Sequence, residues 1–213
     1  LPGKMMCYES KLPFDLRYMV DKRLAGNQWM RIHNVKNREE SEKISRCQYE
    51  VEVESKDLNP IFLEVPQKDD PIWKDLGLEY DPETETCDDT GPVRIMSFDI
   101  ECAGRRGHFP DPEIDPTIQI CCWLKVAGEE EPRFGVAFSY GQCRAIDGVQ
   151  VYNFNSEHKM LLAFADFVRY VDFEISTGYN IDNFDWKYLI ERAEALRLGS
   201  DFLDMGRLKG KNA

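Results

Sequence analysis

Two carboxylates separated by a single residue are the part of the sequence best suited to chemistry. Asp99 and Glu101 lie in Arg94–Glu101, where apolar and polar side chains alternate as in a β-strand. A strand rises about 3.3 Å per residue, so both carboxylates would project from one face, about 6 to 7 Å apart. Two ionised carboxylates on a half-buried strand repel each other unless a cation lies between them. The pair therefore fits a site for Mg²⁺ or Mn²⁺, although Asp-x-Glu also occurs on the solvated faces of many strands.

A second polar cluster occupies the segment Gly178-Tyr-Asn-Ile-Asp-Asn-Phe-Asp185. At the junction between a strand and a helix, such side chains can project beside the carboxylates of a neighbouring strand. The peptide dipoles at the start of the next helix would also favour Asp185. The alternative interpretation is that Asp182, Asn183 and Asp185 merely cap that helix, which is the commoner role of such residues taken alone. Both acidic segments together favour a shared metal site.

Other catalytic arrangements are not indicated. The sequence has no Gly-rich phosphate loop and no Ser/His/Asp nucleophile arrangement, and its three histidines lack the spacing of metal ligands. Its seven cysteines include no Cys-x-x-Cys pair, so neither a disulfide framework nor a zinc ribbon is predicted. We expect these cysteines to be reduced thiols.

The two acidic segments belong to a pattern in which strands and helices alternate. Period-two alternation and apolar runs predict strands at 93–101, 117–126, 134–140, 149–154 and 173–179. Apolar residues at helical spacing predict one helix capped by Ser156, and a second over 184–198 that stops at Gly199. Three antiparallel strands followed by a helix, a strand and another helix indicate a mixed α/β domain. The pattern does not fix the strand order.

Composition divides the chain into three zones. Residues 1–56 are predicted to form part of a small β-rich region, with strands at Phe14–Val20 and Cys47–Val53. Residues 57–92 are rich in acidic side chains and proline, which is typical of a connector. Residues 93–213 then form the α/β domain.

The charge balance limits the kinds of partner. Lys and Arg total 27 against 39 Asp and Glu, a net charge of −12. This balance disfavours a basic protein that coats DNA, and a nucleic acid would have to be held locally or by other parts of a larger assembly. The longest stretch without a charged residue, 134–143, is too short for a transmembrane helix.

Two motifs place these residues in a known family. Phe98-Asp-Ile-Glu101 and Asn180-x-x-x-Phe184-Asp185 resemble the first and second exonuclease motifs of family B DNA polymerases. Longer strings resemble a eukaryotic replicative member of that family over nearly the whole chain: Cys7–Ser10, Pro13–Asp21, Met96–Gly104, Gly107–Pro112 and Asp115–Ile120. The resemblance implies a ribonuclease H-like exonuclease domain, a mixed sheet with flanking helices, that removes mispaired nucleotides from the 3′ end of DNA.

The same resemblance implies roles for individual residues. Asp99, Glu101 and Asp185 match metal ligands for two Mg²⁺ or Mn²⁺ ions, and Asn180 matches a residue that contacts the substrate. The family's third motif, Tyr-x-x-x-Asp, has no match in this sequence. We expect that motif beyond Ala213, and an incomplete, largely inactive site in a chain that is a piece of an intracellular protein.

The resemblance also implies the surroundings in which the chain works. Its partners would be the single-stranded 3′ end and primer-template DNA, the rest of the polymerase catalytic subunit, accessory subunits and a sliding clamp, in the nucleus. The alternative is a non-catalytic scaffold domain that positions the template and other polymerase parts.

Overall fold

The structure is a computed structural model, and it describes residues 11–26, 28–89 and 91–210. Cys7 and the string Cys7–Ser10 lie outside the described residues. The described chain divides into two compact units. The first holds the residues up to Ser41 together with Tyr49–Asp89, and the second holds Glu42–Gln48 together with the residues from 91 onward. The domain boundaries placed at residues 56 and 92 stay a prediction.

The first unit contains short elements around a small aromatic cluster. Trp73 is buried and packs edge-on against Phe62 and Tyr80, with ring centroids 5.8 and 5.6 Å away. Two two-stranded antiparallel sheets form from β1 with β4 and from β2 with β3. The elements are α1 (Phe14–Asp21), β1 (Met30–Ile32), β2 (Lys36–Asn37), β3 (Val51–Glu52), the 3-10 turn Ser55–Asp57, β4 (Leu58–Pro60) and α2 (Ile72–Leu76).

One element of this unit differs from the sequence prediction. Phe14–Val20 was expected as a strand, and it is the helix α1. Helical spacing lets Phe14 stack on Tyr18 and Arg17 pair with Asp21, contacts between residues four apart that a strand cannot make. No residue of α1 is buried, so its apolar alternation was not the mark of a sheet face. The strand expected at Cys47–Val53 is reduced to Val51–Glu52.

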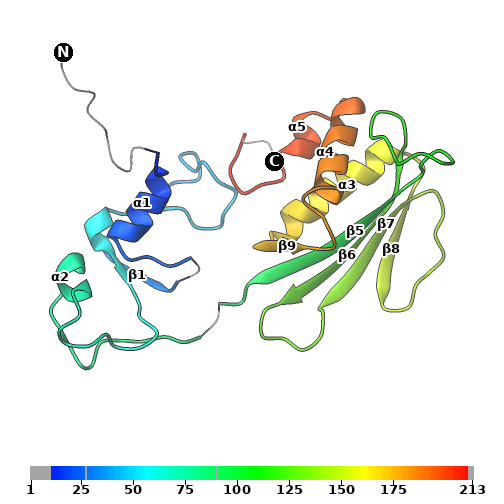
Figure 1. The fold of residues 1–213 in the computed structure, drawn as a ribbon. Helices are drawn as coiled ribbons and strands as arrows, with labels where there is room; N and C mark the ends of the chain where they lie inside the picture. Colours follow the sequence, from blue (N-terminus) through cyan, green and yellow to red (C-terminus); the bar gives the residue numbers. More distant parts are fainter. Residues whose placement is uncertain (1–10, 27, 90, 211–213) are drawn as a thin grey trace, which may run out of the picture. The chain divides into compact units, whose positions relative to one another are not determined.

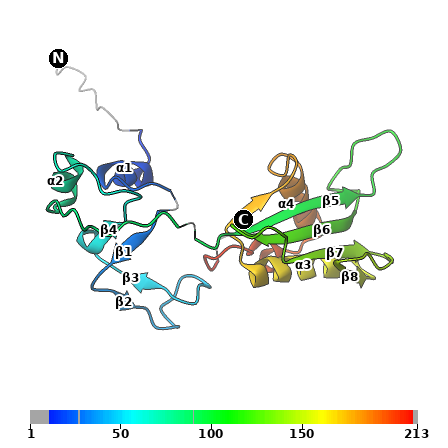
Figure 2. The same cartoon turned by 90° about the horizontal axis from the view of Figure 1, so that it is seen from below.

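The second unit is built on a five-stranded mixed sheet in the order β8-β7-β6-β5-β9 (Figures 1 and 2). β5, β6 and β7 are antiparallel, as predicted, whereas β8 runs parallel to β7 and β9 parallel to β5. The elements are β5 (Arg94–Cys102), β6 (Thr117–Val126), β7 (Phe134–Tyr140), β8 (Val149–Phe154), α3 (Glu157–Val171), β9 (Ile175–Thr177), α4 (Asp185–Ala195) and α5 (Ser200–Leu203). The predicted mixed α/β fold is therefore confirmed.

The helices of this unit cover one face of the sheet. Phe98 on β5 packs on Phe164 of α3 and on Trp186 of α4, with centroids 6.1 and 4.6 Å away. Leu189 and Phe202 complete the same fully buried core. This core packs β5 against the helices. The burial of its apolar side chains is the main source of stability of the second unit. Within the described residues, no helix is long and apolar enough to cross a membrane.

Candidate active site

The strand β5 displays the first two predicted site residues on its open face. Phe98 and Ile100 are 3% and 5% exposed and point into the core, whereas Asp99 and Glu101, the residues that follow them, are exposed. This alternation confirms that the two carboxylates share one face of the strand. On the neighbouring strand, Cys121 lies opposite Asp99 in the register of β5 and β6.

The loop that carries the other predicted residues lies directly against β5. β9 pairs with β5 only as far as Thr177, which lies opposite Ser97. The next residue is Gly178, where an added Cβ would lie 2.5 Å from the carbonyl oxygen of Phe98 and 2.4 Å from Ile181. Only glycine allows the chain to pass this close to the backbone of β5. Gly178 therefore brings the loop 178–185 alongside the stretch of β5 that bears the carboxylates.

Asp185 reaches into the backbone of β5 between the two other acidic residues. Its Oδ1 accepts a hydrogen bond of 3.1 Å from the backbone N–H of Ile100, and the residue is only 1% exposed. Ile100 lies between Asp99 and Glu101 in the chain. The structure thus places the Asp185 carboxylate at the backbone of the β5 stretch that bears Asp99 and Glu101, which lie 86 and 84 residues earlier in the sequence. Their catalytic and metal-binding roles stay a prediction.

The electrostatic environment disfavours the charge on Asp185. Burial raises the pKa of Asp185, and the nearby charge of Asp99 raises it further, whereas the N–H of Ile100 acts in the opposite direction. Burial also raises the pKa of Cys102, at the end of β5, to about 11, so this thiol stays protonated near neutral pH.

Asn180 adopts a backbone conformation that shapes the loop. Its φ is +58°, a left-handed conformation that asparagine tolerates better than most residues. Its carbonyl oxygen accepts hydrogen bonds from the N–H groups of Asn183 and Phe184, and its side-chain oxygen accepts one from the amide of Asn183 at 3.0 Å. Asn180 is exposed, so its side chain is open to solvent on the loop that leads to Asp185. Its contact with a substrate stays a prediction.

The donor set fits a hard divalent cation by its chemistry. Asp99, Glu101 and Asp185 offer only carboxylate oxygens, which are the ligands preferred by Mg²⁺ and Mn²⁺. A buried carboxylate near a second negative charge is also stabilised by a cation. In their present side-chain positions, however, no three or more His, Cys, Asp or Glu residues in the described part of the chain form a group that could hold a metal ion.

The loop between β5 and β6 contributes features that the sequence analysis did not identify. Phe109 is 77% exposed, and its ring lies edge-on to Phe184, next to Asp185, at a centroid distance of 5.3 Å. The buried Asp115 stabilises the loop by accepting hydrogen bonds from the backbone N–H of Asp111 and from Arg105 Nε. Phe109 could have been identified in the sequence as an aromatic residue within a loop that contains several glycine and proline residues.

A buried ion pair supports the same loop. Glu157 of α3 and Arg192 of α4 form a bidentate pair with distances of 2.9 and 2.8 Å, and both side chains are less than 10% exposed. Arg192 also donates to the carbonyl oxygen of Pro112, and Glu157 accepts from the N–H of Thr117. The residues around Glu157 and Arg192 in the sequence do not indicate that these two side chains meet, so the ion pair could not be predicted.

Replacing Gly178 with alanine is expected to displace the loop from β5. The new Cβ would meet the backbone carbonyl oxygen of Phe98 as well as the buried side chain of Ile181. We therefore expect a loss of about 1–3 kcal/mol in the free energy of unfolding and faster amide exchange at Ile100. Urea titration and hydrogen exchange measure these effects. Gly206→Ala is the matched control, because a Cβ there meets no atom within 4 Å. Equal behaviour of the two variants would contradict the close approach at Gly178.

Comparison with known families and curated proteins gives a consistent result. Residues 5–213 match the family described as "DNA polymerase family B, exonuclease domain". The chain is 38% identical over 204 residues to the DNA polymerase delta catalytic subunit of Glycine max and 39% identical over 209 residues to that of Drosophila melanogaster. These alignments cover 96% and 95% of this chain, and the chain spans 17% of the length of each relative.

A solved structure shows the same fold. The family B DNA polymerase from the hyperthermophilic archaeon Pyrobaculum calidifontis superposes with a TM-score of 0.52 and 25% sequence identity, covering 92% of this chain and 19% of that polymerase. The similarity therefore extends from the sequence to the arrangement of the backbone.

Proposed function

This chain belongs to the family B DNA polymerase exonuclease domain family, and from this premise we propose that it is the proofreading 3′–5′ exonuclease region of a replicative polymerase. Its curated relatives are DNA polymerase delta catalytic subunits. The reaction would be hydrolysis of the 3′-terminal phosphodiester of DNA, with a deoxynucleoside monophosphate as the product.

The observation that carries the proposal is the hydrogen bond from Ile100 N–H to Asp185 Oδ1. It holds a carboxylate of the second motif at the backbone between the two carboxylates of the first. A helix cap would require Asp185 only at the start of α4, where the peptide dipoles already favour it. Its insertion at β5 supports the interpretation that these acidic residues act together.

In the proposed mechanism, Asp99, Glu101 and Asp185 would hold the divalent ions. When bound, a pair of Mg²⁺ or Mn²⁺ ions would supply an activated water and would stabilise the negative charge that develops on the leaving 3′ oxygen. The carboxylates of β5 stand on a rigid strand whose other face is locked in the core, which limits their movement. Asn180, exposed on the adjoining loop, would orient the terminal nucleotide.

Single-stranded DNA would contact the loop between β5 and β6 on its way to this site. The exposed ring of Phe109 can stack on an unpaired base, an interaction available to any base because every base has a π-face. A mispaired end frays more easily than a paired one, so selectivity would come partly from the free energy of unpairing, and no readout of the DNA sequence is required. The net charge of −12 requires that other parts of the polymerase contribute most contacts with phosphate.

The proposal includes the cellular context implied by the family. We infer primer-template DNA, the remaining parts of the catalytic subunit, accessory subunits and a sliding clamp as partners, and the nucleus as the location. The relatives' name, DNA polymerase delta catalytic subunit, supports DNA as the substrate. The accessory subunits, the clamp and the nuclear location rest on the family resemblance alone.

The second candidate function is a non-catalytic scaffold domain. A scaffold domain has no functional need for the buried carboxylate of Asp185, whose pKa is raised by burial and by the neighbouring carboxylate of Asp99. The retention of Asp99, Glu101 and Asp185 at one place therefore favours the exonuclease.

The test is trimming of a single-stranded, 3′-labelled oligonucleotide in Mn²⁺ by the full-length polymerase chain that carries this domain. We expect stepwise shortening by the unchanged protein and at least an approximately hundredfold slower rate for Asp99→Ala, because a substitution in the shell that supports a metal ligand already costs 10- to 100-fold. Equal trimming by both proteins would rule out the assigned chemistry.

The same assay applies to the 213 residues alone. We propose that they trim little, because their sequence lacks the Tyr-x-x-x-Asp motif that supplies a further carboxylate in this family. Trimming by the 213-residue chain at the rate of the full-length protein would show that the three carboxylates suffice.

A further inference from the structure

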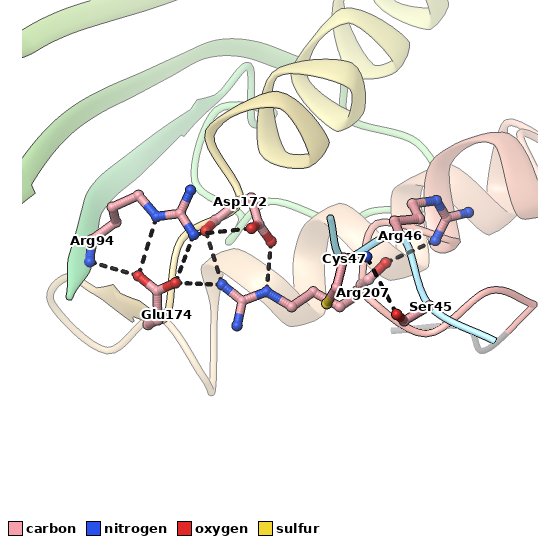
Figure 3. Close-up of polar contacts among 8 residues, drawn as sticks. Ser45, Arg46, Cys47, Arg94, Asp172, Glu174 and Arg207 are labelled. Carbon is pink, nitrogen blue, oxygen red and sulfur yellow. Dashed lines mark hydrogen bonds and ion pairs between the residues drawn. The ribbon is translucent and has the colours of Figure 1, made fainter. Parts of the chain in front are cut away.

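A cluster of four charged residues lies at the end of the sheet where β5 and β9 begin. Arg94 starts β5, Asp172 follows α3, Glu174 precedes β9, and Arg207 lies in the segment after α5. Figure 3 shows the two guanidinium groups facing the two carboxylates, and we call these four residues the register cluster. All four belong to the second compact unit, and none of them is part of the site described above.

Glu174 is fixed to the first residue of β5 by several contacts. Its carboxylate accepts hydrogen bonds from the backbone N–H of Arg94 at 2.6 Å and from Arg94 Nη2 at 2.7 Å. Its own N–H donates to the carbonyl oxygen of Arg94 at 3.0 Å. The Glu174 carboxylate thus accepts a hydrogen bond from the backbone N–H of Arg94, a role that a carbonyl oxygen of a neighbouring strand would otherwise have to fill. These contacts set which residue of β9 lies opposite which residue of β5.

Arg207 strengthens this arrangement from the other side. Its Nε donates to Asp172 Oδ1 at 2.6 Å, and its Nη2 donates to Glu174 Oε1 at 2.5 Å. Arg94 also reaches Asp172, at 2.9 Å. The two arginines hold the pKa of Glu174 at about 2, so the carboxylate stays charged at every pH at which the protein would work.

The segment 204–209 that presents Arg207 is itself held by residues from the N-terminal part of the chain. Arg46 donates its N–H to the carbonyl oxygen of Arg207 at 2.8 Å and pairs through its guanidinium with Asp204. Ser45 and Leu208 form an isolated antiparallel β-bridge. Figure 3 shows Arg46 beside Arg207. Residues 42–48 therefore act as a support for the register cluster, across more than 150 residues of sequence.

Packing alone sets the register of β9 only weakly. The strand has three residues, of which Ile175 is 44% exposed and Thr177 is exposed, and Ser176 makes one side-chain hydrogen bond, from Trp186 Nε1. A strand without a buried face is prone to slip along its neighbour. Gly178 follows β9 at once and leads to Asp185, so a slip of β9 would withdraw the Asp185 carboxylate from Ile100.

We propose that the register cluster is a positioning device for the exonuclease site: it fixes β9 on β5 and so places Asp185 between Asp99 and Glu101. The placement of Asp185 follows from the structure alone, whereas its consequence for trimming rests on the proposed function. The four residues are positioning residues, because they touch neither the carboxylates of the site nor any atom that would react.

The first test measures amide exchange at Ile100 in the 213-residue chain. In Arg207→Gln and in Glu174→Gln, we expect Ile100 to exchange about tenfold faster or more, because a charge-assisted hydrogen bond is lost at the start of β9. Amides of β6 and β7 should keep their protection. Arg207→Lys, which keeps the charge and loses the planar fork, should give an intermediate rate.

Arg23→Gln is the matched control, because it removes the same charge from an exposed ion pair with Asp75 that lies within the first compact unit. Ile100 should exchange at the unchanged rate in this variant. Unchanged exchange at Ile100 in both Arg207→Gln and Glu174→Gln would overturn the proposal. So would an equal acceleration across β6 and β7, because that pattern reports general destabilisation.

The second test measures trimming by the full-length polymerase chain. Arg207→Gln is expected to lower kcat about tenfold or more with little change in KM, because a small misplacement of a reacting group slows the chemical step, while the residues proposed to contact DNA are unaltered. A rise in KM with kcat unchanged would overturn the proposal. If the unchanged enzyme does not trim DNA, the proposed function fails, and amide exchange at Ile100 still decides the positioning role.

Discussion

Asp185→Asn is expected to reduce trimming of a single-stranded 3′ end by at least about a hundredfold, because a substitution in the shell that merely supports a metal ligand already costs 10- to 100-fold. The asparagine side-chain oxygen can still accept the 3.1 Å hydrogen bond from Ile100 N–H. The fold should therefore be retained while the negative charge is removed. Trimming by the full-length polymerase chain gives the rate, and amide exchange at Ile100 in the 213-residue chain checks the hydrogen bond.

Asp182→Asn is the matched control for this prediction. It makes the same chemical change three residues earlier on the same loop, at a position that is exposed, whereas Asp185 is 1% exposed. We expect Asp182→Asn to trim DNA at close to the unchanged rate. Full activity in Asp185→Asn would show that this carboxylate is not a ligand. An equal loss in both variants would mean that the charge of the whole loop, and not one ligand, matters.

The strand β5, which carries Asp99 and Glu101, could be predicted because its burial alternates along the strand. The bounds of β6, β7 and β8 also coincide with the predicted ones. Alternation marked β6, whereas β7, whose five inner residues are all buried, was marked by its apolar run. α1 was predicted wrongly because none of its residues is buried, so its alternation carried no information about a sheet.

The contacts that join distant segments could not be predicted from the sequence. Asp185 finds its hydrogen-bond donor 85 residues away, and Arg46 pairs with Asp204 across 158 residues. Propensity and periodicity describe neighbours in the chain, whereas these contacts depend on strand order and register, which the sequence pattern left open. The resemblance to a family named Asp185 as a site residue, but it did not reveal how Gly178 and the register cluster bring it there.

Arg192→Met is expected to destabilise the second unit by about 3–5 kcal/mol, because removing one member of a buried ion pair leaves the other charge uncompensated. Glu157 is 7% exposed and would keep only the N–H of Thr117 among the partners described above. The carbonyl oxygen of Pro112 would lose its guanidinium donor, so the loop that bears Phe109 should also loosen. Urea unfolding measures the first effect, and amide exchange across residues 103–116 measures the second.

Lys187→Met on the same helix is the control, because Lys187 pairs with Glu191 at 3.9 Å on the solvent-exposed side of α4. An exposed pair of this kind contributes about 0–1 kcal/mol, so its loss should hardly change the unfolding midpoint. Adding Glu157→Gln to Arg192→Met should recover part of the lost stability, since the buried negative charge is then removed as well. If the double variant is no more stable than Arg192→Met, the cost arises from lost packing and not from the uncompensated charge.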